Sequence, residues 1–215
     1  MHLRRVAPAA LVLTALGATL PATAVLTPAA ATPTAAGSAT ARNAPALRAV
    51  ITFDKSQRNP QRSRLHWRVF RVQNGARTLV AHQSWRAGSG FTRHSTNACR
   101  RNDGWLPNGY YAPRLHANYH GSLIKGRAIS LGAKQCANGT LRTDLFIHTE
   151  QGDRNRQCPD RPGDQVCRWE YPRIDDYRSY GCIKLRPHDL KELYDAWRQH
   201  FDLGADPRVR VRVVS

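Results

Sequence analysis

The sequence predicts a mainly β domain with one helix. Leu65, Trp67 and Val69 alternate with polar residues, as in a strand that buries one face. Residues 208–213 read Arg-Val-Arg-Val-Arg-Val, which predicts a strand with its valines inward and its arginines toward solvent. Only one stretch, near the C-terminus, carries apolar residues at helical spacing.

The N-terminal half of this domain predicts a β-hairpin followed by a loop. Residues 48–53 and 65–72 are rich in β-branched and aromatic side chains, which favour strands. The dipeptide Asn74-Gly75 suits positive φ and predicts a tight turn into a strand over 78–86. Residues 88–108 lack periodicity and contain many Gly, Ser, Asn and Asp, so they predict a long loop.

The C-terminal half predicts two more strands and the helix. The strands are expected at 127–132 and 141–148, with His148 ending the second. Pro187 suits the first turn of a helix, and Gly204 is expected to end it. The apolar residues between them are expected in the core: Leu190, Leu193, Tyr194, Trp197 and Phe201.

The first 24 residues predict a secretory signal peptide. Two arginines near the start precede an apolar stretch over 6–20, and Ala22-Thr23-Ala24 fits a small-x-small cleavage site. A retained signal anchor is the alternative, but Pro8 and Thr14 interrupt the apolar run, which is shorter than the ~20 residues that span a bilayer. We therefore expect a secreted protein with no stable membrane insertion after cleavage.

Residues 25–46 predict a flexible linker, because Ala, Thr, Pro, Ser and Gly bury too little surface to offset chain ordering. The remaining segment, 47–215, is long enough for a single domain and short for two.

The chain is strongly basic, with 33 Lys and Arg against 15 Asp and Glu and a net charge of +18. Such a surface is expected to bind polyanions, and for a secreted protein these include anionic wall polymers and membrane headgroups. Nucleic acid is the competing partner. The sequence has no helix-turn-helix, zinc-finger spacing or aromatic RNA-binding motif, so we expect no nucleic-acid function.

Cys182 and His148 predict a nucleophile and its base. Cys182 lies in the segment Ser179-Tyr180-Gly181-Cys182-Ile183-Lys184, and His148 precedes Thr149 upstream. A thiol attacks as thiolate, and a nearby imidazole lowers its pKa and later returns the proton to the leaving group. A buried structural thiol and a core histidine are the alternatives.

These residues resemble the L,D-transpeptidase family, also called the YkuD-like domain. Its signature is an upstream His, a variable spacer and Ser/Thr-x-Gly-Cys, followed by an aliphatic residue and Arg or Asn. Here Ser179, Gly181, Cys182 and Ile183 match, with Lys184 in the last position. Segments 69–75 and 106–110 are similar to the family's early hairpin and its Thr-Pro-x-Gly-aromatic segment. The resemblance covers roughly residues 48–215 and implies the family's β-sandwich with a helical cap.

The chain departs from the family's pattern in two places. Tyr180 stands where members often carry His. The spacer is about twice the usual length, so residues 150–178 are expected to form an insertion beside the active site.

The resemblance implies a cysteine enzyme acting on tetrapeptide stems of peptidoglycan. Cys182 would form a thioester and release D-alanine, and an amine of a neighbouring stem would complete a 3→3 cross-link. The alternatives are an L,D-carboxypeptidase, with water as acceptor, and a non-catalytic wall-binding module. The family's His is oriented by the backbone carbonyl of the next residue, here Thr149. No metal or organic cofactor is implied.

Other residues near the nucleophile have candidate roles. The amides of Gly181 and Cys182 are placed to hold an oxyanion, and Gly181 fits a turn that excludes a side chain. Ser179 could bond the loop or the base. The ring of Tyr180 could form one side of the acyl site, or it could be an ordinary packed aromatic side chain. Lys184 and Arg186 are candidate contacts for a substrate carboxylate, and the alternative for each is a solvated surface charge. Trp105 is a candidate residue of the substrate cleft.

Five cysteines in a secreted chain leave one unpaired, and Cys182 is set aside as the nucleophile. The other four can pair in three ways. We expect Cys158–Cys167, the shortest ring, and Cys99–Cys136. A zinc site is the alternative, but it lacks a Cys-x-x-Cys knuckle and would consume the nucleophile; its ligands would be His148, Cys158, Cys167 and Cys182.

Overall fold

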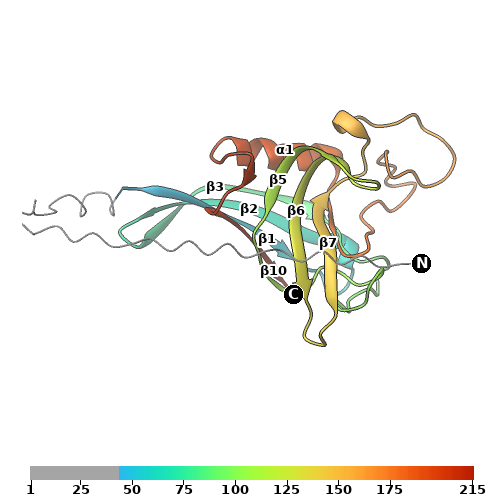
Figure 1. The fold of residues 1–215 in the computed structure, drawn as a ribbon, viewed down its shortest axis with the longest axis horizontal. Coiled ribbons are helices and arrows are strands. Elements are labelled where there is room, and N and C mark those ends of the chain that lie inside the picture. Colours follow the sequence, from blue (N-terminus) through green and yellow to red (C-terminus); the bar gives the residue numbers. More distant parts are fainter. Residues whose placement is uncertain (1–43) are drawn as a thin grey trace, which may run out of the picture. The chain divides into compact units, whose positions relative to one another are not determined.

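The computed structural model describes residues 44–215, and these form two mixed β-sheets with one α-helix (Figure 1). The expected mainly β sandwich with a helical cap is therefore confirmed. The predicted signal peptide and most of the predicted linker lie outside the described residues. No helix in the described part is long and apolar enough to cross a membrane.

The first sheet has the strand order β3-β2-β1-β10-β4. Its strands are β1 (Ala46–Asp54), β2 (Ser63–Gln73), β3 (Ala76–Ala87), β4 (Gly109–Tyr111) and β10 (Val209–Val214). The predicted hairpin is confirmed, with φ of 49° at Asn74 and 79° at Gly75. The C-terminal strand pairs in parallel with β1, and its valines are buried while Arg210 and Arg212 are exposed, as the alternation predicts.

The second sheet has the order β8-β7-β6-β5-β9. Its strands are β5 (Arg114–His120), β6 (Lys125–Gln135), β7 (Leu141–His148), β8 (Ile183–Lys184) and β9 (Gly204–Ala205). The strand predicted over 141–148 has the predicted bounds. Two short 3₁₀ turns, Pro60–Arg62 and Asp153–Asn155, complete the regular elements of the described residues.

Four strands were not predicted from the sequence: β4, β5, β8 and β9. β4, β8 and β9 have three, two and two residues, which is too short for a period of two to be visible. A register shift between His116 and Tyr119 interrupts the alternation of β5.

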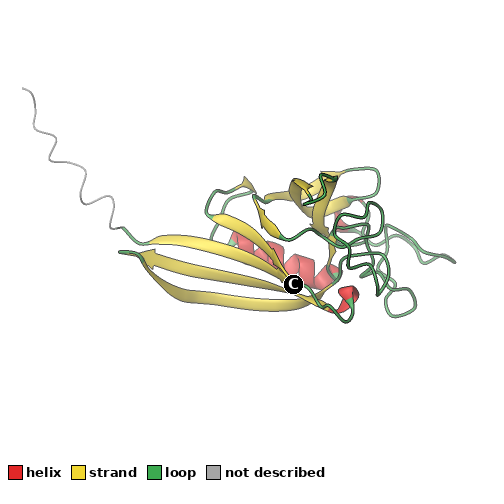
Figure 2. Cartoon of the chain, turned by 90° about the horizontal axis from the view of Figure 1, so that it is seen from below, coloured by secondary structure: helices red, strands yellow, loops and turns green. Residues whose placement is uncertain are grey.

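Helix α1 (Pro187–Arg198) packs its apolar side against the inner face of the first sheet. Trp197 stacks on Trp67 of β2 with ring centroids 6.0 Å apart, and Phe201 meets the Trp67 ring edge-on. Figure 2 shows the helix (red) alongside the long strands. The helix ends before the residue that the sequence predicts. The Trp197 indole donates to the Asp202 carbonyl, which folds the chain back and keeps Phe201 buried beyond the helix.

Trp67 is the centre of this packing and is 1% exposed. We expect Trp67→Ala to lower the free energy of unfolding by about 3–5 kcal/mol, because it removes a large buried side chain and leaves a cavity. Trp67→Phe should cost less, since the indole nitrogen has no hydrogen-bond partner among the described residues. Arg68→Ala, on the opposite face of the strand, is the matched control. Urea unfolding followed by circular dichroism measures all three, and equal losses for Trp67→Ala and Arg68→Ala would contradict this account.

Candidate functional site

A cleft of about 580 Å³ lies beside β7 and β8. The 150–178 segment forms part of its wall, as expected for an insertion next to the site, and contributes Glu150, Asp164 and Asp176. Six of the predicted site residues line this cleft: Cys182, His148, Thr149, Ser179, Tyr180 and Lys184.

The pairing of β7 with β8 brings the nucleophile and base candidates to one face. The strands are parallel, with Ile147 opposite Ile183 and His148 opposite Lys184. Both isoleucines are fully buried in the core. Side chains alternate along a strand, so His148 and Cys182, each adjacent to one of these isoleucines, turn away from the core toward the cleft.

His148 is held in one orientation by its neighbour. Its Nδ1 lies 3.1 Å from the Thr149 carbonyl oxygen, which is the contact that the resemblance implies. A carbonyl only accepts, so Nδ1 carries the hydrogen and Nε2 has a free lone pair. Burial, followed by the nearby Lys184 charge, lowers the pKa of His148 to about 3. The imidazole is therefore neutral near pH 7, in the form that accepts a proton.

Cys182 holds its thiol in a neutral state. Its Sγ lies 3.4 Å from the Asp144 carbonyl oxygen, to which the thiol donates. Desolvation raises the pKa of Cys182 to about 11, against smaller lowering effects of the Phe146 amide and the charges of Lys184 and Arg142. The hydrogen bonds of the described residues include none between Cys182 and His148. The resting pair is thus a thiol and a neutral imidazole rather than an ion pair.

Arg142 of β7 fixes the turn before the nucleophile, and the sequence analysis missed it. Arg142 is 3% exposed, and its guanidinium donates to the carbonyls of Ala98, Gly104 and Tyr180. Gly181 has φ +119°, and a Cβ there would lie 2.1 Å from Arg142 Nη2. The glycine therefore meets both conditions expected of it, positive φ and no room for a side chain.

Ser179 bonds the same turn and not the base. Its hydroxyl donates to the Cys182 carbonyl at 2.6 Å and accepts from the Gly181 amide at 3.3 Å. Tyr180 stacks on Phe91 at 5.0 Å between ring centroids, and 57% of its surface is exposed. It is thus an aromatic wall of the cleft.

Lys184 was expected to contact a substrate carboxylate, but its charge is already paired inside the protein. Its ammonium pairs with Glu150, and both residues are buried. Burial raises the pKa of Glu150 to about 7, although Lys184 pulls it down. Glu150 Oε2 and Asp176 Oδ1 are buried without a hydrogen-bond partner among the described residues. Arg186, the other basic candidate, is exposed at the start of α1.

The prediction that Trp105 contacts substrate is also wrong for this cleft, because Trp105 is not among the residues that line it. It is 4% exposed, and the Lys55 ammonium sits 4.0 Å from its ring centroid. It packs the 88–108 loop rather than facing substrate.

One of the two expected disulfides is present. Cys158 and Cys167 are bonded within the 150–178 segment, which also removes two ligands from the alternative zinc site. Cys99 and Cys136 are free thiols, so the predicted disulfide between them is not formed. Burial, followed by the neighbouring Cys99 thiol, raises the pKa of Cys136 to about 11. This disfavours the thiolate that disulfide exchange requires.

No protein-family model matches the chain, and neither does any curated protein sequence. One similar solved structure is Bd1075 of Bdellovibrio bacteriovorus, with 17% sequence identity and a TM-score of 0.43; the match covers 78% of this chain and 48% of that one. Another is a mutant of the helical cell shape determining protein Pgp2 of Campylobacter jejuni, with 15% identity and a TM-score of 0.44; the match covers 80% of this chain and 49% of that one. This chain spans about half the length of each. These values carry no conclusion about activity.

Arg142→Gln is expected to lower the free energy of unfolding by at least about 2 kcal/mol, because glutamine cannot reach three carbonyls and leaves buried acceptors unpaired. Thermal and urea unfolding measure the change. Arg114→Gln removes an exposed strand arginine and should stay within about 0.5 kcal/mol of wild type. Equal effects of the two substitutions would refute the role assigned to Arg142.

The raised pKa of Cys182 predicts how its alkylation depends on pH. Only the thiolate reacts, so the rate with iodoacetamide should rise about tenfold per pH unit from pH 7 to 10 and level off near pH 11. Peptide mass spectrometry separates Cys182 from the thiols of Cys99 and Cys136, and Cys182→Ala is the control. A rate that is already constant at pH 7 would mean a preformed thiolate–imidazolium pair instead.

Proposed function

We propose that the chain is a member of the L,D-transpeptidase family and a cysteine acyltransferase acting on peptidoglycan tetrapeptide stems. The observation that carries this proposal is the cleft face shared by Cys182 and His148, with Thr149 leaving Nε2 free. A structural thiol and a core histidine would have no need of such a shared, open face.

The proposed reaction uses these two groups. As Cys182 Sγ attacks the carbonyl carbon between the third and fourth stem residues, its proton passes to His148 Nε2 and the carbonyl becomes an oxyanion. The amides of Gly181 and Cys182 are the proposed donors to that oxyanion, and the Gly181 amide would exchange its hydrogen bond to Ser179 for one to the oxyanion. When the C–N bond breaks, His148 returns the proton to the amine of the departing D-alanine, and a thioester remains.

An amine then completes the transfer. Its nitrogen attacks the thioester carbon and gives a proton to His148. As the C–S bond breaks, His148 passes that proton to Cys182 Sγ, which leaves as a thiol. Two cationic side chains, Lys184 and Arg178, line the cleft together with five carboxylates: Asp144, Glu150, Asp164, Asp175 and Asp176. Lys184 pairs with Glu150 and Arg178 with Asp164. The other carboxylates are proposed to attract an amine-bearing acceptor, which loses a proton before it attacks.

Two features support a site of action outside the cytoplasm. The Cys158–Cys167 disulfide fits an oxidising compartment, and the proposed signal peptide would deliver the chain there. We propose the cell wall as its location and peptidoglycan stems as its partner.

The test is mass spectrometry of disaccharide tetrapeptide stems incubated with the protein. Loss of D-alanine together with a cross-linked dimer is expected. Cys182→Ala should abolish both, and His148→Asn should lower the rate at least about 100-fold. Cys99→Ala is the matched control and should retain activity. Loss of D-alanine without a dimer would make the protein an L,D-carboxypeptidase. An unchanged stem with folded wild-type protein would overturn the enzymatic proposal in favour of a wall-binding module.

A further inference from the structure

The outer face of the first sheet carries rows of arginine side chains. Residues at every second position of β1, β2 and β10 are buried in the core, so the intervening ones face outward. Strand pairing aligns Arg210 with Val50 and Val50 with Arg68, and the next row aligns Arg212 with Thr52. We call the outward arginines of this sheet the arginine face: Arg48, Arg64, Arg68, Arg77, Arg210 and Arg212.

The arginine face has almost no compensating negative charge. None of its six arginines lies within 4.0 Å of a carboxylate of the described residues. The five strands of this sheet contain a single acidic residue, Asp54 at the end of β1. The neighbouring guanidinium groups therefore repel one another, and a bound anion would relieve that repulsion.

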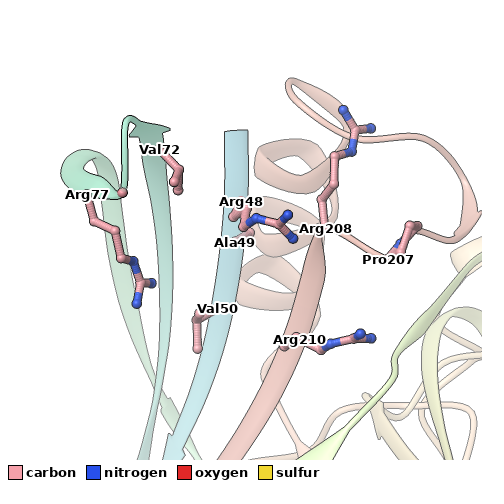
Figure 3. A pocket seen from close by; sticks show the side chains of 9 residues that line it. Arg48, Ala49, Val50, Val72, Arg77, Pro207, Arg208 and Arg210 are labelled. Carbon is pink, nitrogen blue, oxygen red and sulfur yellow. The ribbon is translucent and has the colours of Figure 1, made fainter. Parts of the chain in front are cut away.

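At one end, this face is hollowed into a groove of about 280 Å³. Figure 3 shows arginines from three parts of the sheet around it, with Arg48 on β1, Arg77 at the β2–β3 hairpin, and Arg208 and Arg210 at β10. The floor includes Ala49, Val50 and Val72, and the Arg77 guanidinium lies 4.3 Å from the Phe70 ring centroid. Arg208 is already paired with Asp206, which leaves the other three arginines for a ligand.

We propose that the arginine face binds a linear phosphate-bearing polyanion. Guanidinium groups match phosphate oxygens with two parallel hydrogen bonds. Arg210 and Arg212 are alternate residues of β10, about 6.7 Å apart along the strand. Arg68 lies two strands from Arg210, about 9.6 Å away, with Val50 between them. Arginines at this spacing can contact several phosphates along an extended polymer.

A polymer fits this face better than a membrane surface does. Five of the six arginines lie on the central strands β2, β1 and β10, whereas the exposed aliphatic side chains Leu79 and Val80 lie with Arg77 on the edge strand β3. The exposed Tyr110 of β4 lies opposite Arg212. None of the residues of the arginine face lines the cleft that holds Cys182. Polymer binding is therefore separable from the proposed acyl transfer.

The test measures binding of the full chain to fluorescently labelled long-chain inorganic polyphosphate by anisotropy at 50, 100 and 200 mM NaCl. Because each arginine–phosphate contact releases a counterion, the affinity should fall steeply with salt. The triple variant Arg48→Gln, Arg210→Gln, Arg212→Gln should bind at least about tenfold more weakly, with a salt slope smaller by about 2–3.

The matched control changes three exposed arginines elsewhere: Arg101→Gln, Arg161→Gln and Arg198→Gln. It removes the same net charge and should weaken binding less than about threefold. Thermal unfolding checks that both variants fold, and Cys182→Ala should bind polyphosphate as wild type does, whatever its effect on stems. Equal weakening in the two triple variants would overturn the proposal. So would absence of polyphosphate binding by wild type, or tighter binding to phosphatidylglycerol vesicles or single-stranded DNA than to polyphosphate.

Discussion

The pairing of the two-residue strand β8 with β7 is the constraint on which the cleft depends. Ile147 and Ile183 are fully buried opposite each other, and this burial fixes the register. A slip of one residue would turn Ile183 into the cleft and Cys182 into the core, because alternate residues face opposite sides. The hydrophobic core therefore determines where the thiol and the imidazole lie, although neither group contributes to the core itself.

A buried cation organises the turn before the thiol. Removing a guanidinium from water is costly unless its donors are satisfied, and Arg142 meets carbonyls of Ala98, Gly104 and Tyr180. Those carbonyls belong to segments far apart in the sequence, so the arginine ties the long 88–108 loop to the nucleophile turn. The space that Arg142 needs is available only because residue 181 has no side chain.

The molecule separates its charges. Carboxylates gather at the cleft, while the outer face of the first sheet has arginines and one acid. Burial in the cleft disfavours the charged forms of three groups: it lowers the pKa of His148 and raises the pKa of Cys182 and Glu150. Glu150 is paired with Lys184 in this environment. The cleft thus holds carboxylates beside a neutral thiol and a neutral imidazole, whereas the outer face is exposed and strongly positive.

The sequence by itself determined the elements with a local signature: the Asn74-Gly75 hairpin, the alternating C-terminal strand, the start of the helix at Pro187, and Cys182 with His148 as a candidate pair. The first three depend on residue periodicity and turn chemistry, which neighbouring residues alone establish, and the Cys182–His148 pair depends on the motif that resembles the L,D-transpeptidase signature. The tertiary structure decided the short strands, the burial of Trp105, the pairing of Lys184 with Glu150, the free Cys99 and Cys136, and the role of Arg142. Each of these depends on contacts between segments distant in the chain, and such contacts leave no periodic trace in the sequence.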